Sequence, residues 1–282
     1  MIIGYHSSIS NGFKKCMENA KENNVNIIQI FLRSPRTSKC IPKKEIDLIT
    51  LHDISKKLNI NIVIHGNYLV NLCRPSNDFK LKLSITSVIQ DLYESSIIDA
   101  LGVVIHMGHN VCNISDDEAF NNYVENVKYI LKNSVPTSIL ILETGAGQGH
   151  EIATKLSELN RIRESLSINE KKRVKFCIDT CHLFSSGYNL NNKLLDNDIN
   201  NVLGWDNVCL VHLNDSKSDF NKRKDRHADI GKGYIKMKGL RKMIELCIKY
   251  KIPMILETPE DIYNGKKFTF LHQIKFINKN LI

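Results

Sequence analysis

Two side chains that could bind a metal ion stand close together in the second half of the chain. An apolar run from Val174 to Ile178 is typical of a buried strand, Asp179 follows it directly, and His182 comes three residues later. A carboxylate and an imidazole just past a strand end are held on a rigid support, where they can share one ion. An aspartate in this position more often caps a helix or forms a turn. The elements around the pair must decide between these interpretations.

Short apolar runs recur along the chain, with room for a helix between each run and the next. The runs are Ile2–Tyr5, Ile27–Phe31, Asn61–Ile64, Gly102–Ile105, Ile139–Leu142, Val174–Ile178, Val208–Val211 and Pro253–Leu256. They show little alternation of polar and apolar residues, which is typical of strands buried on both faces of a parallel sheet. Eight such units in 282 residues predict an α/β fold, a single (β/α)8 TIM barrel, as one domain over residues 1–282.

Apolar stripes at helical spacing predict the helices between these strands. One helix would open at Pro42 and direct Ile46, Ile49 and Leu58 towards the core. We find no low-complexity linker or shift in composition that would divide the chain.

In a TIM barrel, the C-terminal ends of the strands meet on one face and carry the chemistry. Seven of the eight predicted strands are followed by a side chain that could bind a metal ion; the exception is the second strand. In chain order these are His6, His65, His106, Glu143, Asp179 with His182, His212 and Glu257, and the loop after the seventh strand adds Asp225 and His227. This convergence of nitrogen and oxygen donors predicts a multinuclear metal site at the C-terminal ends of the strands.

The donor set is larger than one tetrahedral ion can use. Without His6 it comprises five histidines, two aspartates and two glutamates: His65, His106, His182, His212, His227, Asp179, Asp225, Glu143 and Glu257. Mixed imidazole and carboxylate ligands favour Zn²⁺, with Mn²⁺ or Fe as alternatives, in a group of two or three ions that share a bridging carboxylate. Adjacent divalent ions suit the displacement of a phosphodiester. His6 could be structural or could hydrogen-bond a ligand, and His109 and His150 receive no role.

The charge of the chain favours a polyanionic partner. Its 39 Lys and Arg residues against 30 Asp and Glu residues give a formal charge of +9, which suits nucleic acid first and an anionic membrane second. Solubility alone is the simpler explanation of that charge. No run approaches the ~18 apolar residues of a membrane span, and the first residues lack the layout of a signal peptide. We therefore expect a soluble intracellular protein, with its eight scattered cysteines as free thiols.

Three loops predicted at the active face carry side chains suited to DNA. The loop before His227 holds five basic residues, Lys217, Lys222, Arg223, Lys224 and Arg226, which could contact phosphates. The loops after the second and third strands offer Arg36, Tyr68 and Leu69. Such residues can enter a minor groove and replace a displaced nucleotide in the base stack. Ordinary loop packing is the alternative for each of these loops.

Motifs along most of the chain together match one family. They are His65-Gly-Asn-Tyr68, Val104-Ile-His106-Met-Gly108, Leu142-Glu143-Thr-Gly-Ala-Gly147, Asp179-Thr-Cys-His182, His212-Leu-Asn-Asp-Ser-Lys217, Asp225-Arg-His227 and Leu256-Glu257-Thr-Pro259. Through them the chain resembles the endonuclease IV family of abasic-site (AP) endonucleases, which are TIM barrels with a trinuclear zinc site.

The resemblance implies a role for each donor. His65 and His106 would hold the first zinc ion, and Glu143 would bridge it to the second. Asp179, His212 and Glu257 would complete the second site, while His182, Asp225 and His227 would hold the third ion. Glu143 and Glu257 would be the catalytic residues.

The resemblance also implies an activity, a DNA-repair hydrolase of base excision repair. The enzyme would hydrolyse the phosphodiester 5′ to an abasic site in double-stranded DNA, leaving a 3′-hydroxyl and a 5′-deoxyribose phosphate, and 3′-phosphodiesterase or 3′–5′ exonuclease activity could accompany it. A monomer fits the family. In the family, residues matching Arg36, Tyr68 and Leu69 enter the DNA and favour a flipped-out abasic nucleotide.

Two other classes of protein compete with this interpretation. A TIM-barrel sugar isomerase or epimerase would use one or two metal ions and a small polar pocket, with no use for a third site beside a basic loop. A non-catalytic lesion-binding protein would keep the basic face but need not keep all the donors, because buried carboxylates are costly without their ions. Metal stoichiometry and incision of DNA separate these classes.

Overall fold

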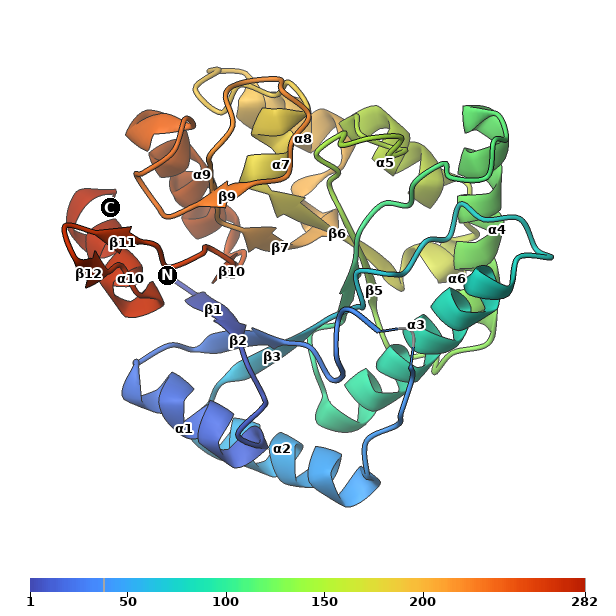
Figure 1. Ribbon diagram of the computed structural model, residues 1–282, viewed down its shortest axis with the longest axis horizontal. Coiled ribbons are helices and arrows are strands. Elements are labelled where there is room, and N and C mark those ends of the chain that lie inside the picture. The colour runs from blue at the N-terminus through green and yellow to red at the C-terminus, as the bar shows by residue number, and fades with distance from the viewer. Residues whose placement is uncertain (38, 282) are drawn as a thin grey trace.

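The computed structural model describes residues 1–37 and 39–281, and its strands close into a parallel barrel (Figure 1). Around the barrel the strand order is β1-β10-β7-β6-β5-β4-β3-β2, and β2 pairs in turn with β1. The barrel strands are β1 (Ile3–Ser7), β2 (Ile27–Ile30), β3 (Asn61–His65), β4 (Val103–Ile105), β5 (Leu140–Glu143), β6 (Val174–Asp179), β7 (Val208–His212) and β10 (Met254–Leu256). Each overlaps one predicted run, which confirms the predicted TIM barrel.

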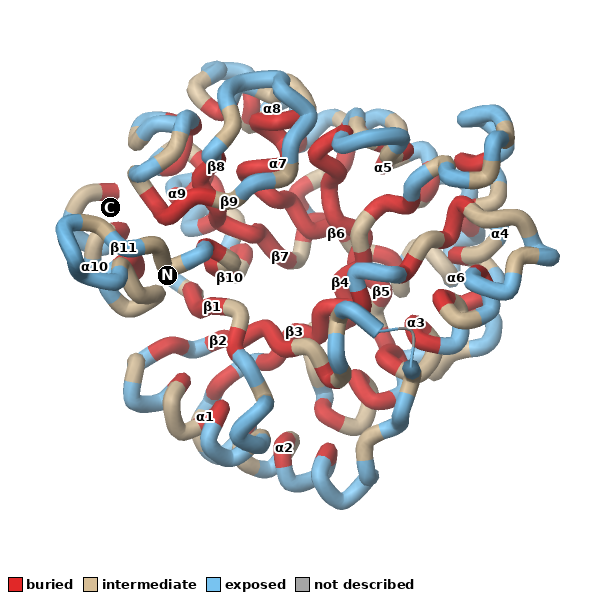
Figure 2. The backbone as a smooth tube through the Cα atoms, in the orientation of Figure 1, coloured by how far each residue is buried: buried red, intermediate tan, exposed pale blue. Residues whose placement is uncertain are grey.

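Helices surround this barrel, and most of them bury one face. They are α1 (Phe13–Glu22), α2 (Glu45–Leu58), α3 (Phe79–Ile98), α4 (Asp116–Lys132), α5 (Leu156–Glu164), α6 (Ile168–Lys171), α7 (Thr180–Ser185), α8 (Leu195–Val202), α9 (Lys236–Tyr250) and α10 (Phe270–Asn280), with a 3₁₀ helix η1 (Trp205–Asn207). Helix α7 is buried throughout, and the short α6 has no buried residue. Figure 2 shows the barrel strands almost wholly buried and the outward faces of the helices exposed. None of the described helices is long and apolar enough to cross a membrane.

The predicted inward face of α2 is wrong at Ile46 and Ile49, whereas Leu58 is half-buried and packs against the core as predicted. Ile46 and Ile49 are 65% and 42% exposed, whereas Leu48, Leu51 and Ser55 pack inward. The helix also begins at Glu45 rather than at Pro42. Its sequence offers apolar residues on more than one side, and contact with α1 and α3 decides which side faces inward.

The interior of the barrel carries an apolar layer to which seven strands contribute one residue each. The layer consists of Ile27, Val63, Val104, Ile141, Cys177, Leu210 and Ile255. Successive side chains of a strand point to opposite faces, so the residue two positions further on also points into the barrel. Those next residues are Gln29, His65, His106, Glu143, Asp179, His212 and Glu257. A polar layer therefore rests directly on an apolar floor, at the C-terminal ends of the strands.

Two small antiparallel pairs lie outside the barrel. Strand β8 (Asp215–Ser216) pairs with β9 (His227–Ala228), so that the basic loop between them folds back to the barrel mouth. Strand β11 (Ile262–Tyr263) pairs with β12 (Lys266–Lys267) to form a hairpin between β10 and α10. All eight cysteines are free thiols, as predicted.

Candidate metal centre

The structure brings all the predicted donors together at the barrel mouth, in three groups, two of which share a residue. Within each group the donor atoms lie within 4.8 Å of one another. The groups are His65 with His106 and Glu143; Glu143 with Asp179, His212 and Glu257; and His182 with Asp225 and His227. Glu143 belongs to two of the groups, as a bridging carboxylate would.

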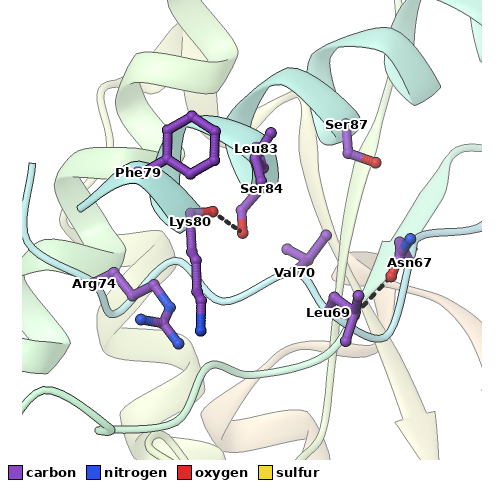
Figure 3. Close-up of a pocket in the computed structure, with 9 residues that line it drawn as sticks. All are labelled: Asn67, Leu69, Val70, Arg74, Phe79, Lys80, Leu83, Ser84 and Ser87. Carbon is purple, nitrogen blue, oxygen red and sulfur yellow. Dashed lines mark hydrogen bonds between the residues drawn. The ribbon is translucent and has the colours of Figure 1, made fainter. Parts of the chain in front are cut away.

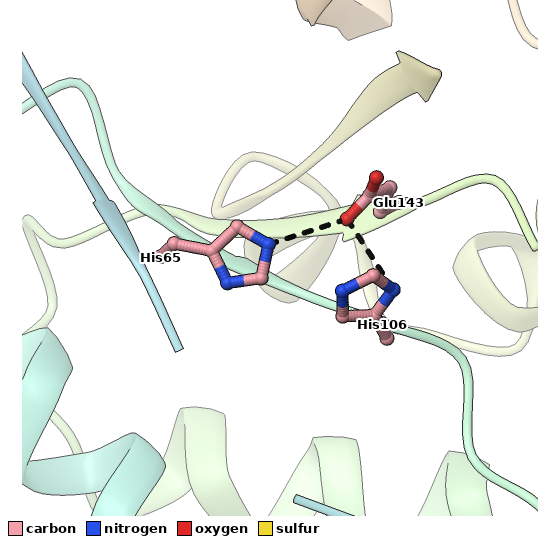
Figure 4. A group of neighbouring side chains, drawn as sticks. All are labelled: His65, His106 and Glu143. Carbon is pink, nitrogen blue, oxygen red and sulfur yellow. Dashed lines mark ion pairs between the residues drawn. The ribbon is translucent and has the colours of Figure 1, made fainter. Parts of the chain in front are cut away.

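The first group joins three neighbouring strands (Figure 4). His65 Nε2 and His106 Nδ1 each lie 3.6 Å from Glu143 Oε2. Both imidazoles point a ring nitrogen at the same carboxylate oxygen. His65 Nδ1 lies 2.8 Å from the carbonyl oxygen of Gly66, which leaves Nε2 free to bind an ion.

The second group lies deepest in the barrel. His212 Nδ1 stands 2.9 Å from Glu143 Oε1 and 3.1 Å from Glu257 Oε2. Asp179 serves two roles at once: Oδ1 accepts the backbone N–H of His182 at 2.8 Å and caps α7, while Oδ2 lies 3.9 Å from His212 Nδ1. The helix-capping interpretation of this aspartate is therefore confirmed, and its role as a metal ligand stays a prediction with which the position of Oδ2 agrees.

The third group stands at the rim, where the end of the basic loop returns. Asp225 Oδ1 lies 3.2 Å from His182 Nε2 and 3.3 Å from His227 Nε2. His182 Nδ1 is 2.8 Å from the carbonyl oxygen of Thr144. That contact fixes the ring and turns Nε2 towards Asp225.

Three buried donor atoms of the centre lack a hydrogen-bond partner. They are Glu143 Oε2, His182 Nε2 and His227 Nε2. Buried polar atoms are normally paired, so each of these requires another explanation. Two ligands that bind one ion at about 2.1 Å with tetrahedral angles stand roughly 3.4 Å apart, close to the 3.2–3.6 Å seen at these atoms. The residues therefore fit divalent metal ions.

The electrostatics of the centre keep its carboxylates ionised. Burial would raise the pKa of Glu143, but the imidazoles of His106 and His212 outweigh it and hold this pKa well below the usual range. Burial likewise opposes ionisation of Glu257, yet His212 lowers its pKa to about 2. Burial would lower the pKa of His182, but the carboxylates of Asp179 and Asp225 outweigh burial and raise this pKa well above its ordinary value. The carboxylates of the centre are thus in the ionised form in which they can bind metal ions.

Cys181 also approaches Asp179 and His227 closely enough to bind an ion. Burial raises the pKa of its thiol to about 12. A thiol that remains protonated is a poor ligand, so geometry and acidity together favour the nitrogen and oxygen donors.

Reasoning from the sequence missed the residue that the second strand contributes. Gln29 is fully buried, and its Nε2 donates to Glu257 Oε1 at 2.6 Å, while its Oε1 lies 2.8 Å from His212 Nε2. Its amide is not titratable, so it was not among the predicted ligand-type residues. The signal that could have found it is a glutamine inside an otherwise apolar strand, at the position where the other strands carry donors.

His6 stands beside this ring of donors rather than within it. Its Nδ1 lies 3.0 Å from Gln29 Nε2 and 3.9 Å from Glu257 Oε1, and burial lowers its pKa to about 4. His6 is thus neutral at pH 7 and contacts the partners of the centre. His109 and His150 lie on exposed loops outside it.

The side chains predicted to enter DNA lie on exposed rim loops. Tyr68 and Leu69 are 52% and 53% exposed, and the Tyr68 ring packs 5.1 Å from Phe31, 5.6 Å from His65 and 5.8 Å from His106, between ring centroids. Arg36 is exposed on the neighbouring loop. The tyrosine thus stands directly over the first group of donors.

A buried ionic cluster anchors the loop that carries Arg36. The guanidinium of Arg33 pairs with Asp91 and, at 2.6 Å, with Glu94 Oε2, and all three side chains are at most 7% exposed. Asn67 joins this loop to the next, since its Nδ2 donates to the carbonyl oxygen of Ser34 at 3.1 Å. The two rim loops are therefore fixed to each other and to α3.

The basic loop is exposed but well anchored. Hydrogen bonds connect Asn221 N–H to the carbonyl oxygen of Phe184 and Arg223 N–H to that of Ser185, both on α7. Lys222, Arg223, Lys224 and Arg226 are exposed, whereas Lys217 pairs with Asp261 at 2.6 Å. Four of the five basic side chains that are predicted to contact phosphates can thus reach a ligand.

Two cavities meet at the Tyr68 loop. One, of about 330 Å³, opens at the metal centre and includes Tyr68, His106, His182 and Asp225 in its lining. The other, of about 420 Å³, lies between the same loop and α3, where Phe79 and Lys80 face Leu69 and Val70 (Figure 3). Leu69, Val70 and Arg74 line both cavities, so this segment forms their common wall.

The closed barrel and its donor cluster define the class of protein. A family model described as "Xylose isomerase-like TIM barrel" matches residues 17–279. A solved structure of a D-tagatose 3-epimerase-like protein shares the fold, with a TM-score of 0.74 at 17% identity over 100% of this chain and 97% of that one.

More specific likenesses separate the chain from the sugar enzymes of this class. It is 36% identical over 273 residues to a Petrotoga mobilis protein named "Probable endonuclease 4", covering 92% of each chain. The crystal structure of endonuclease IV from Thermus thermophilus matches with a TM-score of 0.79 at 24% identity over 93% of each chain. The chain belongs to the endonuclease IV family.

Proposed function

We propose that this protein is an AP endonuclease that hydrolyses the phosphodiester 5′ to an abasic site in double-stranded DNA. As a member of the endonuclease IV family it is a nuclease, a hydrolase that acts on DNA. The observation that carries the proposal is the set of three donor groups, two of which share Glu143, beneath an exposed tyrosine on a rim loop. The products would be a 3′-hydroxyl and a 5′-deoxyribose phosphate, and blocked 3′ ends would be further substrates of the same centre.

Three zinc ions are the cofactor that we propose, one in each donor group, with Mn²⁺ or Fe as alternatives at some sites. His65, His106 and Glu143 would hold one ion, and Glu143, Asp179, His212 and Glu257 the second. His182, Asp225 and His227 would hold the third. When bound, such ions lower the pKa of water and stabilise negative charge on phosphate and leaving-group oxygens.

The protein's own residues orient the reacting groups. Glu143 and Glu257 would stand beside the attacking water as ionised carboxylates, because histidine neighbours hold both pKa values low. Gln29 fixes Glu257 through Oε1, and the Oε2 atom faces His212. All donors come from one chain, so a monomer suffices for the reaction.

DNA recognition would involve the rim loops. Tyr68 and Leu69 would occupy the space left by the missing base, with Arg36 in the groove beside them. The lower unstacking cost at an abasic site would favour this arrangement over one on intact DNA. Lys222, Arg223, Lys224 and Arg226 would contact phosphates beside the third donor group.

Incision of a duplex with one synthetic abasic site, together with metal analysis of the same sample, tests the proposal. We expect cleavage 5′ to the site, about three zinc ions per chain, one for each donor group, and loss of both on chelation. Glu143→Gln should abolish incision while DNA affinity and folding persist, because the amide cannot bridge two ions as a carboxylate does. Cleavage by Glu143→Gln at the wild-type rate would exclude the bridging role. A wild-type protein with fewer ions and no incision would favour a sugar isomerase or epimerase instead.

A further inference from the structure

A second basic surface lies outside the centre, around the β11–β12 hairpin and α10. A cavity of about 480 Å³ opens there, and no acidic residue lines it. Its basic lining residues are Lys232, Lys266, Lys267, Lys275, Lys279 and His272. Figure 1 shows the hairpin and α10 at one edge of the barrel, on the side of β10.

Few acidic groups neutralise these lysines. Lys267 Nζ pairs with Glu260 Oε2 at 2.9 Å. Within residues 1–37 and 39–281, no ion pair involves Lys232, Lys266, Lys275 or Lys279. Like charges gathered on one surface raise the local potential and attract a polyanion.

Aromatic rings form the floor of this surface, and they pack against one another. The centroid of Phe268 lies 6.0 Å from that of Tyr263 and 6.1 Å from that of Phe276, both edge to face. Lys232 Nζ stands over Tyr263 at 4.9 Å and over Phe268 at 5.6 Å. A single-stranded ligand needs ring faces on which its bases can stack, so a phosphate backbone suits this surface better.

Buried hydrogen bonds fix the surface in position relative to the metal centre. Asp229 is fully buried, two residues after His227, and its carboxylate accepts the backbone N–H groups of Glu260 at 2.9 Å and Asp261 at 2.8 Å. The same carboxylate accepts Nε2 of Gln273, on α10, at 2.8 Å. The hairpin and α10 are therefore attached to the segment that carries a candidate ligand.

The surface is also continuous with the basic loop at the barrel mouth. Lys217, at the start of that loop, pairs with Asp261 at the base of the hairpin. Asp261 and Glu260 stand at this junction, but Lys217 and Lys267 pair with their carboxylates, so a strand of phosphates that follows the basic loop could extend onto the hairpin past acidic groups that are already neutralised.

We propose that this hairpin surface binds the phosphate backbone of a duplex flank, several nucleotides away from the bond that is cut. The inference rests on the proposed function, since it assigns a second contact to the same DNA substrate. Lys266, Lys275 and Lys279 neutralise phosphates there, and the contact contributes affinity without taking part in the chemistry.

The test replaces these three lysines together by glutamine (Lys266→Gln, Lys275→Gln and Lys279→Gln) in the metal-loaded protein. A matched control carries Lys15→Gln, Lys57→Gln and Lys132→Gln, which remove the same charge from exposed sites on or beside α1, α2 and α4. Binding of an abasic duplex with a non-hydrolysable linkage is measured between about 50 and 200 mM salt. The duplex is used at full length and trimmed on either side of the lesion.

We expect the hairpin variant to lose roughly tenfold or more in affinity for the full-length duplex, with a salt slope lower by about 2 to 3. Trimming the duplex on one side of the lesion should lower the affinity of the wild-type protein to that of the hairpin variant. Trimming it on the other side should not. The rate of incision at saturating DNA should stay unchanged. The proposal is overturned if the hairpin variant behaves like the control, or if its loss is the same on every trimmed duplex. Incision by the wild-type protein is scored separately, so that a failure of the AP endonuclease proposal is recognised as such.

Discussion

Gln29 completes the ring of polar side chains that the barrel strands direct into the mouth. It is the member of that ring that cannot titrate, and it contacts His212, Glu257 and His6. An amide suits this position because it donates to a carboxylate with one atom and accepts from an imidazole with the other. The amide therefore sets both the orientation of Glu257 and the ring nitrogen of His212 that faces the metal centre.

Replacing Gln29 by Leu should lower kcat for abasic-site incision by about 10- to 100-fold, the usual effect of losing a partner of a metal ligand. The fold should persist, because leucine continues the apolar strand. Incision kinetics and metal content measured on one preparation check this expectation. A variant that keeps both wild-type kcat and full metal content would remove Gln29 from the positioning of the centre.

Glu151 is a second residue whose environment has a measurable consequence. Burial raises the pKa of this carboxyl to about 7 from an ordinary 4.5, although Oε2 accepts the N–H of Gly147 at 2.7 Å. The folded state thus holds the proton more tightly than the unfolded chain does. The resulting stability is complete below pH 4.5 and is lost as the pH rises through about 7.

Glu151→Gln should therefore become increasingly stable relative to wild type as the pH rises through this window, by about 3 kcal/mol at the upper end. The amide can still accept the Gly147 N–H, so the comparison isolates the ionisation. Denaturant unfolding of both proteins across the window measures the difference. A difference that stays constant with pH would show that Glu151 ionises normally in the folded protein.

The loop after β2 shows how an element can be fixed by charge rather than by apolar packing. Arg33 supplies the positive charge, while Asp91 and Glu94 on α3 bring two negative charges into the same buried space. Buried ion pairs seldom stabilise a fold more than apolar residues would. We attribute to this cluster the placement of the loop that carries Arg36.

Arg33→Met alone should destabilise the protein by about 3–5 kcal/mol, since it leaves two buried carboxylates without their partner. The triple change Arg33→Met, Asp91→Leu and Glu94→Leu should recover most of that stability but leave the loop less restrained. Unfolding free energies, with protease cleavage in the loop as the second measurement, distinguish the two variants. Equal stability of the single variant and the wild type would show that the cluster is open to water in solution.

The sequence predicted the elements well where burial on both faces imposes a pattern. Every barrel strand is an apolar run, and a ligand-type side chain near the end of all but β2 indicated where the centre lies. The orientation of α2 was not predictable, because Ile46 and Leu48 lie on different faces of the helix and both are apolar. Contact with the neighbouring helices determines which of these faces is buried. The hairpin at residues 262–267 was also missed, since two-residue strands leave no periodic signal.

At the scale of the whole molecule, the donor groups concentrate negative charge inside the barrel. The carboxylates of Glu143, Asp179 and Glu257 converge there with Asp225 at the rim. Bound cations would relieve their mutual repulsion. Because the unfolded chain has no such site, binding free energy adds to the stability of the folded state.

Removal of metal by a chelator should therefore lower the unfolding midpoint markedly, while the barrel core keeps the stripped protein folded. An ion at 1,000 times its Kd contributes about 4 kcal/mol, and several ions act together here. Thermal unfolding before chelation, after it and after the return of zinc provides the measurement. A midpoint that does not change on stripping would mean that no ion was bound at these donors.

The strand order also has a consequence for synthesis of the protein. The barrel closes where β10, the last of its strands along the chain, inserts between β1 and β7. Glu257 follows that strand directly, whereas His65 and His106 emerge from the ribosome far earlier. A chain that ends before β10 would thus lack both one wall of the barrel and Glu257, one of the proposed ligands. By the proposed mechanism, DNA cleavage would become available only when translation has passed this strand.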